Sequence, residues 1–187
     1  MAWTPPKKKI SPEKALSLAR QRATPLWVRG KALFWPEQDT PESAVQLRVL
    51  EPEFSKGIHA FAFFEPGHDA GAGLGRRFKE LFDRYSDLGI EFYCVIQAPA
   101  SQQEFPAEAK SWFQHEHWSI AALADAGGLL SRCWGLQTHG KGLVIFKGGQ
   151  LEQLWNPDVE ELKAFELRFQ AWLRVEDPGL PLIDPNF

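Results

Sequence analysis

The chain contains few cysteines: Cys94 and Cys133 are the two among its 187 residues. Two cysteines cannot form the multi-disulfide framework that holds many small secreted domains together. They are enough for one bridge or for one redox pair. Thiol chemistry is therefore the first functional class that the sequence has to support or exclude.

Other absences exclude further classes. The chain has 21 Lys and Arg against 24 Asp and Glu, a formal net charge of −3. It lacks the excess of basic residues that is typical of a nucleic-acid-binding protein. No stretch approaches the roughly 20 consecutive apolar residues of a membrane span. The charged N-terminus, with Lys7 to Lys9, is not followed by the apolar segment of a secretory signal. We therefore expect a cytoplasmic protein, in which thiols stay reduced.

Apolar and aromatic residues are plentiful. The chain is 44% hydrophobic and 13% aromatic, with 14 Phe and 8 Trp, so it has ample apolar area for one well-packed domain. We expect an N-terminal extension over residues 1–56 that packs on the core, a core domain over residues 57–176, and an irregular tail over residues 177–187.

The N-terminal extension begins with a helix signal. Ser11 is a good N-cap and Pro12 suits the first helical position, which predicts a helix to about residue 23. Residues 26–28 and 32–35 flank a glycine and predict a hairpin, and alternation over residues 45–49 predicts a further strand.

The core domain shows a regular succession of elements. The pattern first predicts a buried strand at 58–64, a glycine-rich loop at 65–75, a helix ending before Gly89 and a strand at 90–96. It then predicts a helix at 107–114, an extended segment at 118–123 and a turn at 125–128. A strand hairpin at 143–155 and a helix capped by residues 156–158 complete the domain. A helical crossover makes the first two strands parallel, whereas the hairpin must be antiparallel. The fold class is α/β, with a mixed central sheet and helices on both faces.

This order of elements resembles the thioredoxin-like superfamily, in particular its peroxiredoxin and membrane-anchored thiol-reductase branches. Residues 60–67, 123–136 and 142–150 carry the resemblance, as the first core strand, an aspartate-turn-helix-glycine segment and the final hairpin. It implies a three-layer fold, here with a helix-plus-hairpin extension at the N-terminus.

The family's redox residues are missing from the positions that the resemblance implies. Where a thiol reductase has Cys-x-x-Cys, this chain has His68, Asp69, Ala70 and Gly71; a peroxidatic cysteine would fall between Gly71 and Gly73. The proline that precedes the last hairpin is replaced by a facing loop that contains His139 and Gly140. The sequence therefore predicts a degenerate active-site loop at residues 68–73.

The two cysteines lie elsewhere. Cys94 is expected in the middle of a strand, where a small buried residue is normal, and Cys133 in the short helix, remote from the expected active-site loop. We expect structural roles for both, with thiol chemistry through Cys133 or Cys94 as the alternative.

Two ligand sites are weaker hypotheses. His68, Asp69 and His139 could together hold a metal ion, against the simpler interpretation of surface histidines on loops. Gly73, Gly75, Arg76 and Arg77 could cradle an anion at the start of the helix.

The function that the sequence favours is a non-redox, non-catalytic thioredoxin-like binding module. We expect no cofactor, a protein partner or small ligand, no nucleic acid, and possible assembly into a homo-oligomer. The alternatives are a thiol oxidoreductase or peroxidase with atypically placed cysteines, and a metal or anion carrier.

Overall fold

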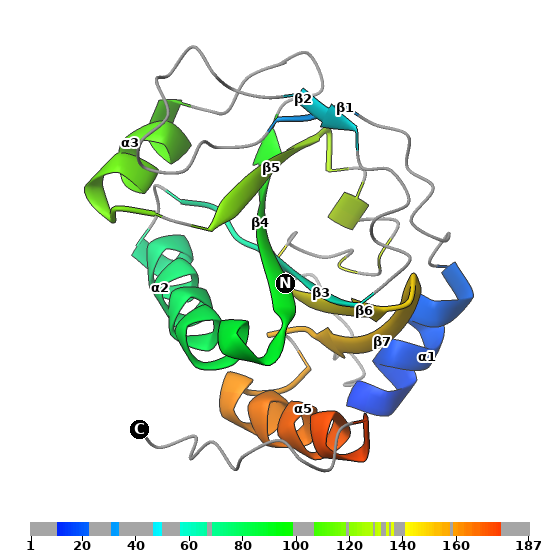
Figure 1. Ribbon diagram of the computed structural model, residues 1–187. Helices are drawn as coiled ribbons and strands as arrows, with labels where there is room; N and C mark the ends of the chain where they lie inside the picture. The colour runs from blue at the N-terminus through cyan, green and yellow to red at the C-terminus, as the bar shows by residue number, and fades with distance from the viewer. Residues whose placement is uncertain are drawn as a thin grey trace, which may run out of the picture.

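A five-stranded sheet with the order β5-β4-β3-β6-β7 forms the centre of the computed structural model (Figure 1). The described residues are 11–22, 31–33, 47–49, 57–66, 69–98, 107–118, 120–128, 130–131, 134, 136, 141–157 and 159–176. Within them, no helix is long and apolar enough to span a membrane.

The sheet is mixed, as predicted. The central strand β3 (Ile58–Phe63) is parallel to β4 (Ile90–Ala98) and antiparallel to β6 (Gly142–Lys147). At the two edges, β5 (Ala121–Ala126) is parallel to β4, and β7 (Gln150–Trp155) is antiparallel to β6. The parallel crossover and the antiparallel hairpin are both confirmed.

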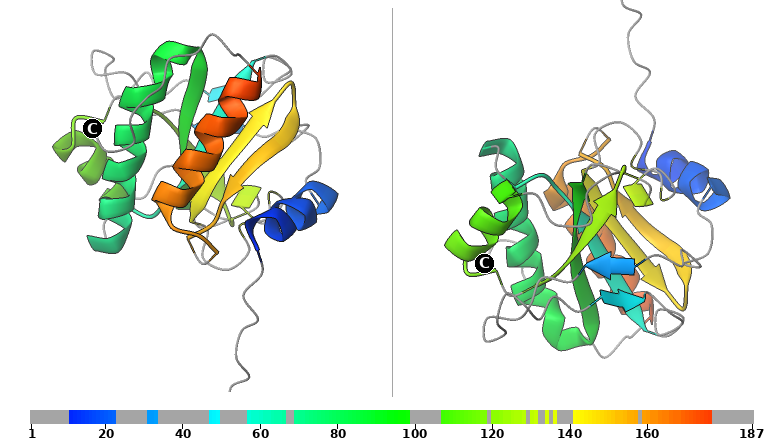
Figure 2. Two further views of the ribbon diagram at one scale, coloured as in Figure 1. Left: turned by 90° about the horizontal axis from the view of Figure 1, so that it is seen from below. Right: turned by 90° about the horizontal axis from the view of Figure 1, so that it is seen from above.

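Helices α2 (Asp69–Tyr85) and α5 (Leu162–Glu176) lie side by side on one face of the sheet (Figure 2, left). The short helix η3 (Ser86–Leu88) extends α2 and ends at Gly89, which adopts a left-handed conformation (φ 75°). Helix α3 (Ala107–His115) buries Ala109, Trp112 and Phe113, the three residues that its spacing predicts. These helices bury one large core, rich in aromatic and aliphatic side chains, against the sheet.

The opposite face has a second core cluster, centred on Phe61, Phe63, Trp134 and Phe146. The two-stranded sheet of β1 (Lys31–Leu33) and β2 (Leu47–Val49) lies over this face, where β1 contacts β5 (Figure 2, right). Helix α1 (Pro12–Arg22) packs beside β7, and its Ala15 and Leu16 contact the second cluster. Its first turn is capped as predicted, because the Lys14 N–H donates to Ser11 Oγ at 3.3 Å.

Two expected boundaries are wrong, and one expected pairing stays a prediction. Strand β1 pairs with β2. The hairpin partner predicted for it, residues 26–28, lies outside the described residues. The segment expected as a turn at 125–128 begins inside β5, which reaches Ala126 and adds a third parallel strand. Helix α5 starts at Leu162, because the backbone first turns back on itself through N–H groups of Val159 and Glu160 that donate to the Asn156 carbonyl.

Candidate functional site

The junction between β3 and α2 is the place where the sequence predicts the active-site loop. Phe64 follows β3 and is 1% exposed, Glu65 and Pro66 continue the chain, and α2 begins at Asp69. Asp69, Ala70 and Gly71 thus form the first turn of a 17-residue helix. The backbone N–H groups and the dipole of a first helical turn stabilise an anion. In proteins with a cysteine at such a turn, they lower the pKa of the thiol and favour the reactive thiolate. In this chain no cysteine lies in that turn; His68 is outside the described residues.

The expected glycine-rich loop is a helix instead. Gly71, Gly73 and Gly75 all lie within α2. Close packing explains why position 75 is a glycine. A Cβ atom there would lie 2.7 Å from both Phe64 Cε2 and Trp112 Cη2. Tertiary contact with these buried rings therefore outweighs the low helix propensity of glycine.

This helix changes the geometry of the proposed anion cradle. Only the first four N–H groups of a helix lack intrahelical partners, and Gly73 and Gly75 lie beyond them. Arg76 also has a partner: its Nη2 donates to Glu116 Oε1 at 2.7 Å, and its Nε lies 3.3 Å from both carboxylate oxygens. This contact lowers the pKa of Glu116 and raises that of Arg76. Arg77 is exposed on the same helix.

The segment before β6 comes close to the β3–α2 junction. Lys141 Nζ lies 4.0 Å from Glu65 Oε2. Gly142 then begins β6 with φ 152°, and a Cβ there would lie 2.5 Å from the Trp155 carbonyl oxygen, so the position requires glycine. His139 and Gly140 lie outside the described residues. Their contact with His68, and with it the metal site at His68, Asp69 and His139, stays a prediction; among the residues that are described, no cluster suits a metal ion.

Cys94 is a buried thiol in the middle of the sheet. It lies in β4 between Ala62 of β3 and Ala122 of β5, is free, and is 1% exposed. Burial raises the pKa of the Cys94 thiol far above its usual range. Because the thiolate is the nucleophile, this environment makes Cys94 unreactive at neutral pH. Cys133 lies outside the described residues.

The aspartate of the aspartate-turn-helix segment has a structural role. Asp125 is 2% exposed at the end of β5. Its carboxylate accepts the N–H groups of Leu130 at 2.9 Å and Ser131 at 3.1 Å. Both oxygens of the Asp125 carboxylate therefore help to hold the helical turn that follows β5.

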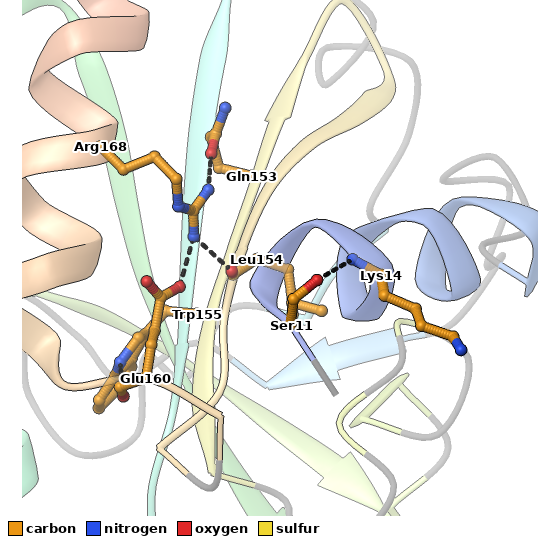
Figure 3. A network of polar contacts seen from close by, with 7 residues as sticks. All are labelled: Ser11, Lys14, Gln153, Leu154, Trp155, Glu160 and Arg168. Atoms are coloured by element: carbon orange, nitrogen blue, oxygen red, sulfur yellow. Dashed lines mark hydrogen bonds and ion pairs between the residues drawn. The ribbon is translucent and has the colours of Figure 1, made fainter. Parts of the chain in front are cut away.

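A polar cluster that the sequence does not predict joins α5 to β7 (Figure 3). The Arg168 guanidinium donates to Gln153 Oε1, to the Leu154 carbonyl at 3.0 Å and to Glu160 Oε1 at 2.5 Å. Gln153 is 7% exposed. Little in the sequence signals this cluster, because a bulge between the pairs Ile145–Gln153 and Phe146–Leu151 breaks the alternation along β7.

Comparison with known proteins supports the fold. No family model matches the chain, and no curated protein matches it. Among solved structures, an oxidised thioredoxin-like protein superposes with a TM-score of 0.57 at 15% identity, covering 83% of this chain and 98% of that one. A putative thioredoxin from Neisseria meningitidis gives 0.56 at 11% identity, covering 79% and 91%.

A peroxiredoxin Q from Xanthomonas campestris also gives a TM-score of 0.56 at 11% identity, covering 78% of this chain and 90% of that one. These superpositions cover most of each chain, and the mixed sheet with its crossover helix agrees with them. The chain therefore has the thioredoxin-like fold, as its sequence predicts.

Proposed function

We propose that this chain is a non-redox thioredoxin-like protein that acts as a protein- or ligand-binding module. The observation that carries the proposal is the first turn of α2, where Asp69, Ala70 and Gly71 occupy the helix start that would activate a thiol. The buried position of Cys94 supports it further.

The alternative is a thiol oxidoreductase or peroxidase that uses Cys133. One structural likeness favours this alternative, since the bacterioferritin comigratory protein of Xanthomonas campestris has alkyl peroxide reduction activity. Such an activity here would need a thiolate outside the helix start.

Assays of insulin reduction and peroxide consumption on the full chain separate the two functions. We expect wild type to match the protein-free blank, and Cys133→Ser to behave the same. Oxidation of Cys133 by mild peroxide, read by mass spectrometry, should be no faster than that of an unstructured peptide thiol. Activity in wild type that disappears in Cys133→Ser overturns the proposal.

Installing the missing cysteines tests the placement of the expected active-site loop. The double variant His68→Cys/Gly71→Cys should form a reversible disulfide and reduce insulin, because one thiol precedes α2 and the other lies in its first turn. A matched double variant, His68→Cys/Gly73→Cys, changes the spacing and should remain inactive. If His68→Cys/Gly71→Cys forms no disulfide, the expected placement of residues 68–71 is wrong.

A further inference from the structure

Helix α5 carries an apolar row on the side that faces away from the sheet. Its buried apolar side chains, on the sheet side, are Phe165, Phe169 and Leu173. Four exposed apolar residues on the outer side follow one another at spacings of three and four residues: Ala164, Leu167, Ala171 and Val175. No described element covers this row, which we call the α5 stripe (Figure 2, left). Its two large side chains, Leu167 and Val175, are 51% and 81% exposed.

Basic side chains lie along one side of the α5 stripe. Lys163 and Arg174 are both exposed, and they share one side of the helix because they lie about three helical turns apart. The stripe therefore offers an apolar surface with a positively charged border. Such a surface suits a segment that is both apolar and acidic.

The segment that directly follows α5 has this composition. Residues 177–187 lie outside the described residues, and their sequence contains two Asp and neither Lys nor Arg. It also contains four large apolar residues: Leu180, Leu182, Ile183 and Phe187. Segment 177–187 thus complements the α5 stripe in both charge and polarity.

The start of this segment favours a reversal of the chain. Pro178 and Gly179 suit the two central positions of a type II turn, and they follow within three residues of the end of α5 at Glu176. A chain that turns back at this point runs antiparallel to α5. The sequence therefore directs the apolar residues of the segment toward the stripe.

The spacing of the apolar residues also matches. Prolines at 181 and 185 favour an extended conformation of about 3.1 Å per residue, so Leu180 and Ile183 lie about 9 Å apart. Six residues of an α-helix span about the same distance. With Ile183 beside Leu167, Leu180 therefore falls between Ala171 and Val175.

We propose that segment 177–187 folds back on α5 and covers the α5 stripe. A stripe with two large exposed side chains is too small for a stable interface between separate molecules, which buries about 1,000 Å² or more. A segment joined directly to α5 acts at an effective concentration of about millimolar, so a weak contact is enough to hold it. A second copy would also bring the same basic side chains of two chains together, because a twofold interface pairs a surface with itself. The inference goes beyond the proposed function and does not depend on it.

Labelling of a thiol in the stripe by N-ethylmaleimide tests this cover in the full chain. Ala171→Cys is made in a Cys133→Ser background, and its labelling rate is measured with and without Leu180→Ser/Ile183→Ser. We expect the unaltered segment to slow labelling at least about fivefold, which corresponds to a stripe that is covered about 80% of the time. Equal rates overturn the proposal.

Two further thiols serve as controls in the same background. Ser111→Cys is exposed on α3, away from the stripe, and should be labelled at the same rate with either form of the segment. Cys94 is 1% exposed and should stay unlabelled in every variant, which shows that the fold is intact.

Charge and concentration distinguish the occupants. Lys163→Gln/Arg174→Gln should reduce the protection of Ala171→Cys at least about twofold, whereas Arg77→Gln on α2 should leave it unchanged. Full protection after Lys163→Gln/Arg174→Gln contradicts the charged border as part of the contact. Protection that grows with protein concentration, together with a dimer in sedimentation, overturns the proposal in favour of a second copy.

Discussion

Gly75 shows how one residue fixes the position of α2 over the aromatic core. A methyl group there would meet Phe64 and Trp112 at 2.7 Å. The helix propensity of alanine would add about 1 kcal/mol of stability, but overpacking against buried rings costs about 1–3 kcal/mol. We expect Gly75→Ala to lower the free energy of unfolding by about 1 kcal/mol, measured by denaturant unfolding.

Gly73 supplies the matched control on the same helix. A Cβ atom there has no neighbour within 4 Å, so Gly73→Ala should raise the free energy of unfolding by about 0.5–1 kcal/mol. The two substitutions then have opposite signs. An increase in stability for both would mean that α2 does not pack closely on Phe64 and Trp112.

At single residues, the sequence predicts what depends on local pattern. The buried face of α3 and the Ser11 cap were predicted correctly, because both follow from spacing along one helix. Gly75 was expected in a loop, because its helical conformation depends on rings that come from β3 and α3. Gln153 was missed for the same reason: its partner Arg168 lies on another element.

The contact between α2 and α5 includes a buried ion pair. Arg84 Nη1 lies 2.7 Å from Glu166 Oε1, and their side chains are 22% and 7% exposed. Tyr85 donates to the same oxygen at 3.2 Å and accepts from Gln170 at 2.8 Å. Arg84→Met leaves the Glu166 charge uncompensated, so it should lower the free energy of unfolding by about 2 kcal/mol.

Two further variants test whether the loss of stability comes from the unpaired Glu166 charge or from removing any positive charge from α2. Arg84→Met/Glu166→Leu should recover most of the lost stability, since both charges are gone. Arg77→Met removes an exposed charge from the same helix and should change stability by less than about 0.5 kcal/mol. A double variant no more stable than Arg84→Met would contradict this explanation.

Among the elements, those with a strong period or a defined turn were predictable, such as β3, β4 and the Gly148–Gly149 hairpin. Pairing partners were not. The antiparallel partner of β1 is β2, and the edge position of β5 beside β4 depends on long-range pairing that no local pattern encodes. A helix after β3 was predictable, but its start at Asp69, inside the expected glycine-rich loop, required the structure.

Across the whole molecule, buried ionisable groups set the stability at alkaline pH. Burial raises the pKa of Cys94 above its value in an unfolded chain, which is about 8.5. Below that pH the thiol is protonated in both states, and its contribution to stability is complete. As pH rises further, only the unfolded chain releases the proton, so stability falls by up to about 1.4 kcal/mol per pH unit. Desolvation also raises the pKa of Tyr85 above its value in an unfolded chain, which is about 10. Above that pH, the Tyr85 hydroxyl therefore causes a further fall in the free energy of unfolding.

Cys94→Ala should therefore flatten the alkaline loss of stability. Between about pH 9 and pH 10.5, wild type should lose about 1–2 kcal/mol more than the variant, measured by denaturant unfolding at each pH. Cys133 and Tyr85 are present in both proteins, so their contributions cancel in the difference. Parallel curves would mean that the folded chain accommodates a Cys94 thiolate. A thiolate in the sheet would restore Cys94 as a redox candidate, so this measurement bears on the function as directly as on the fold.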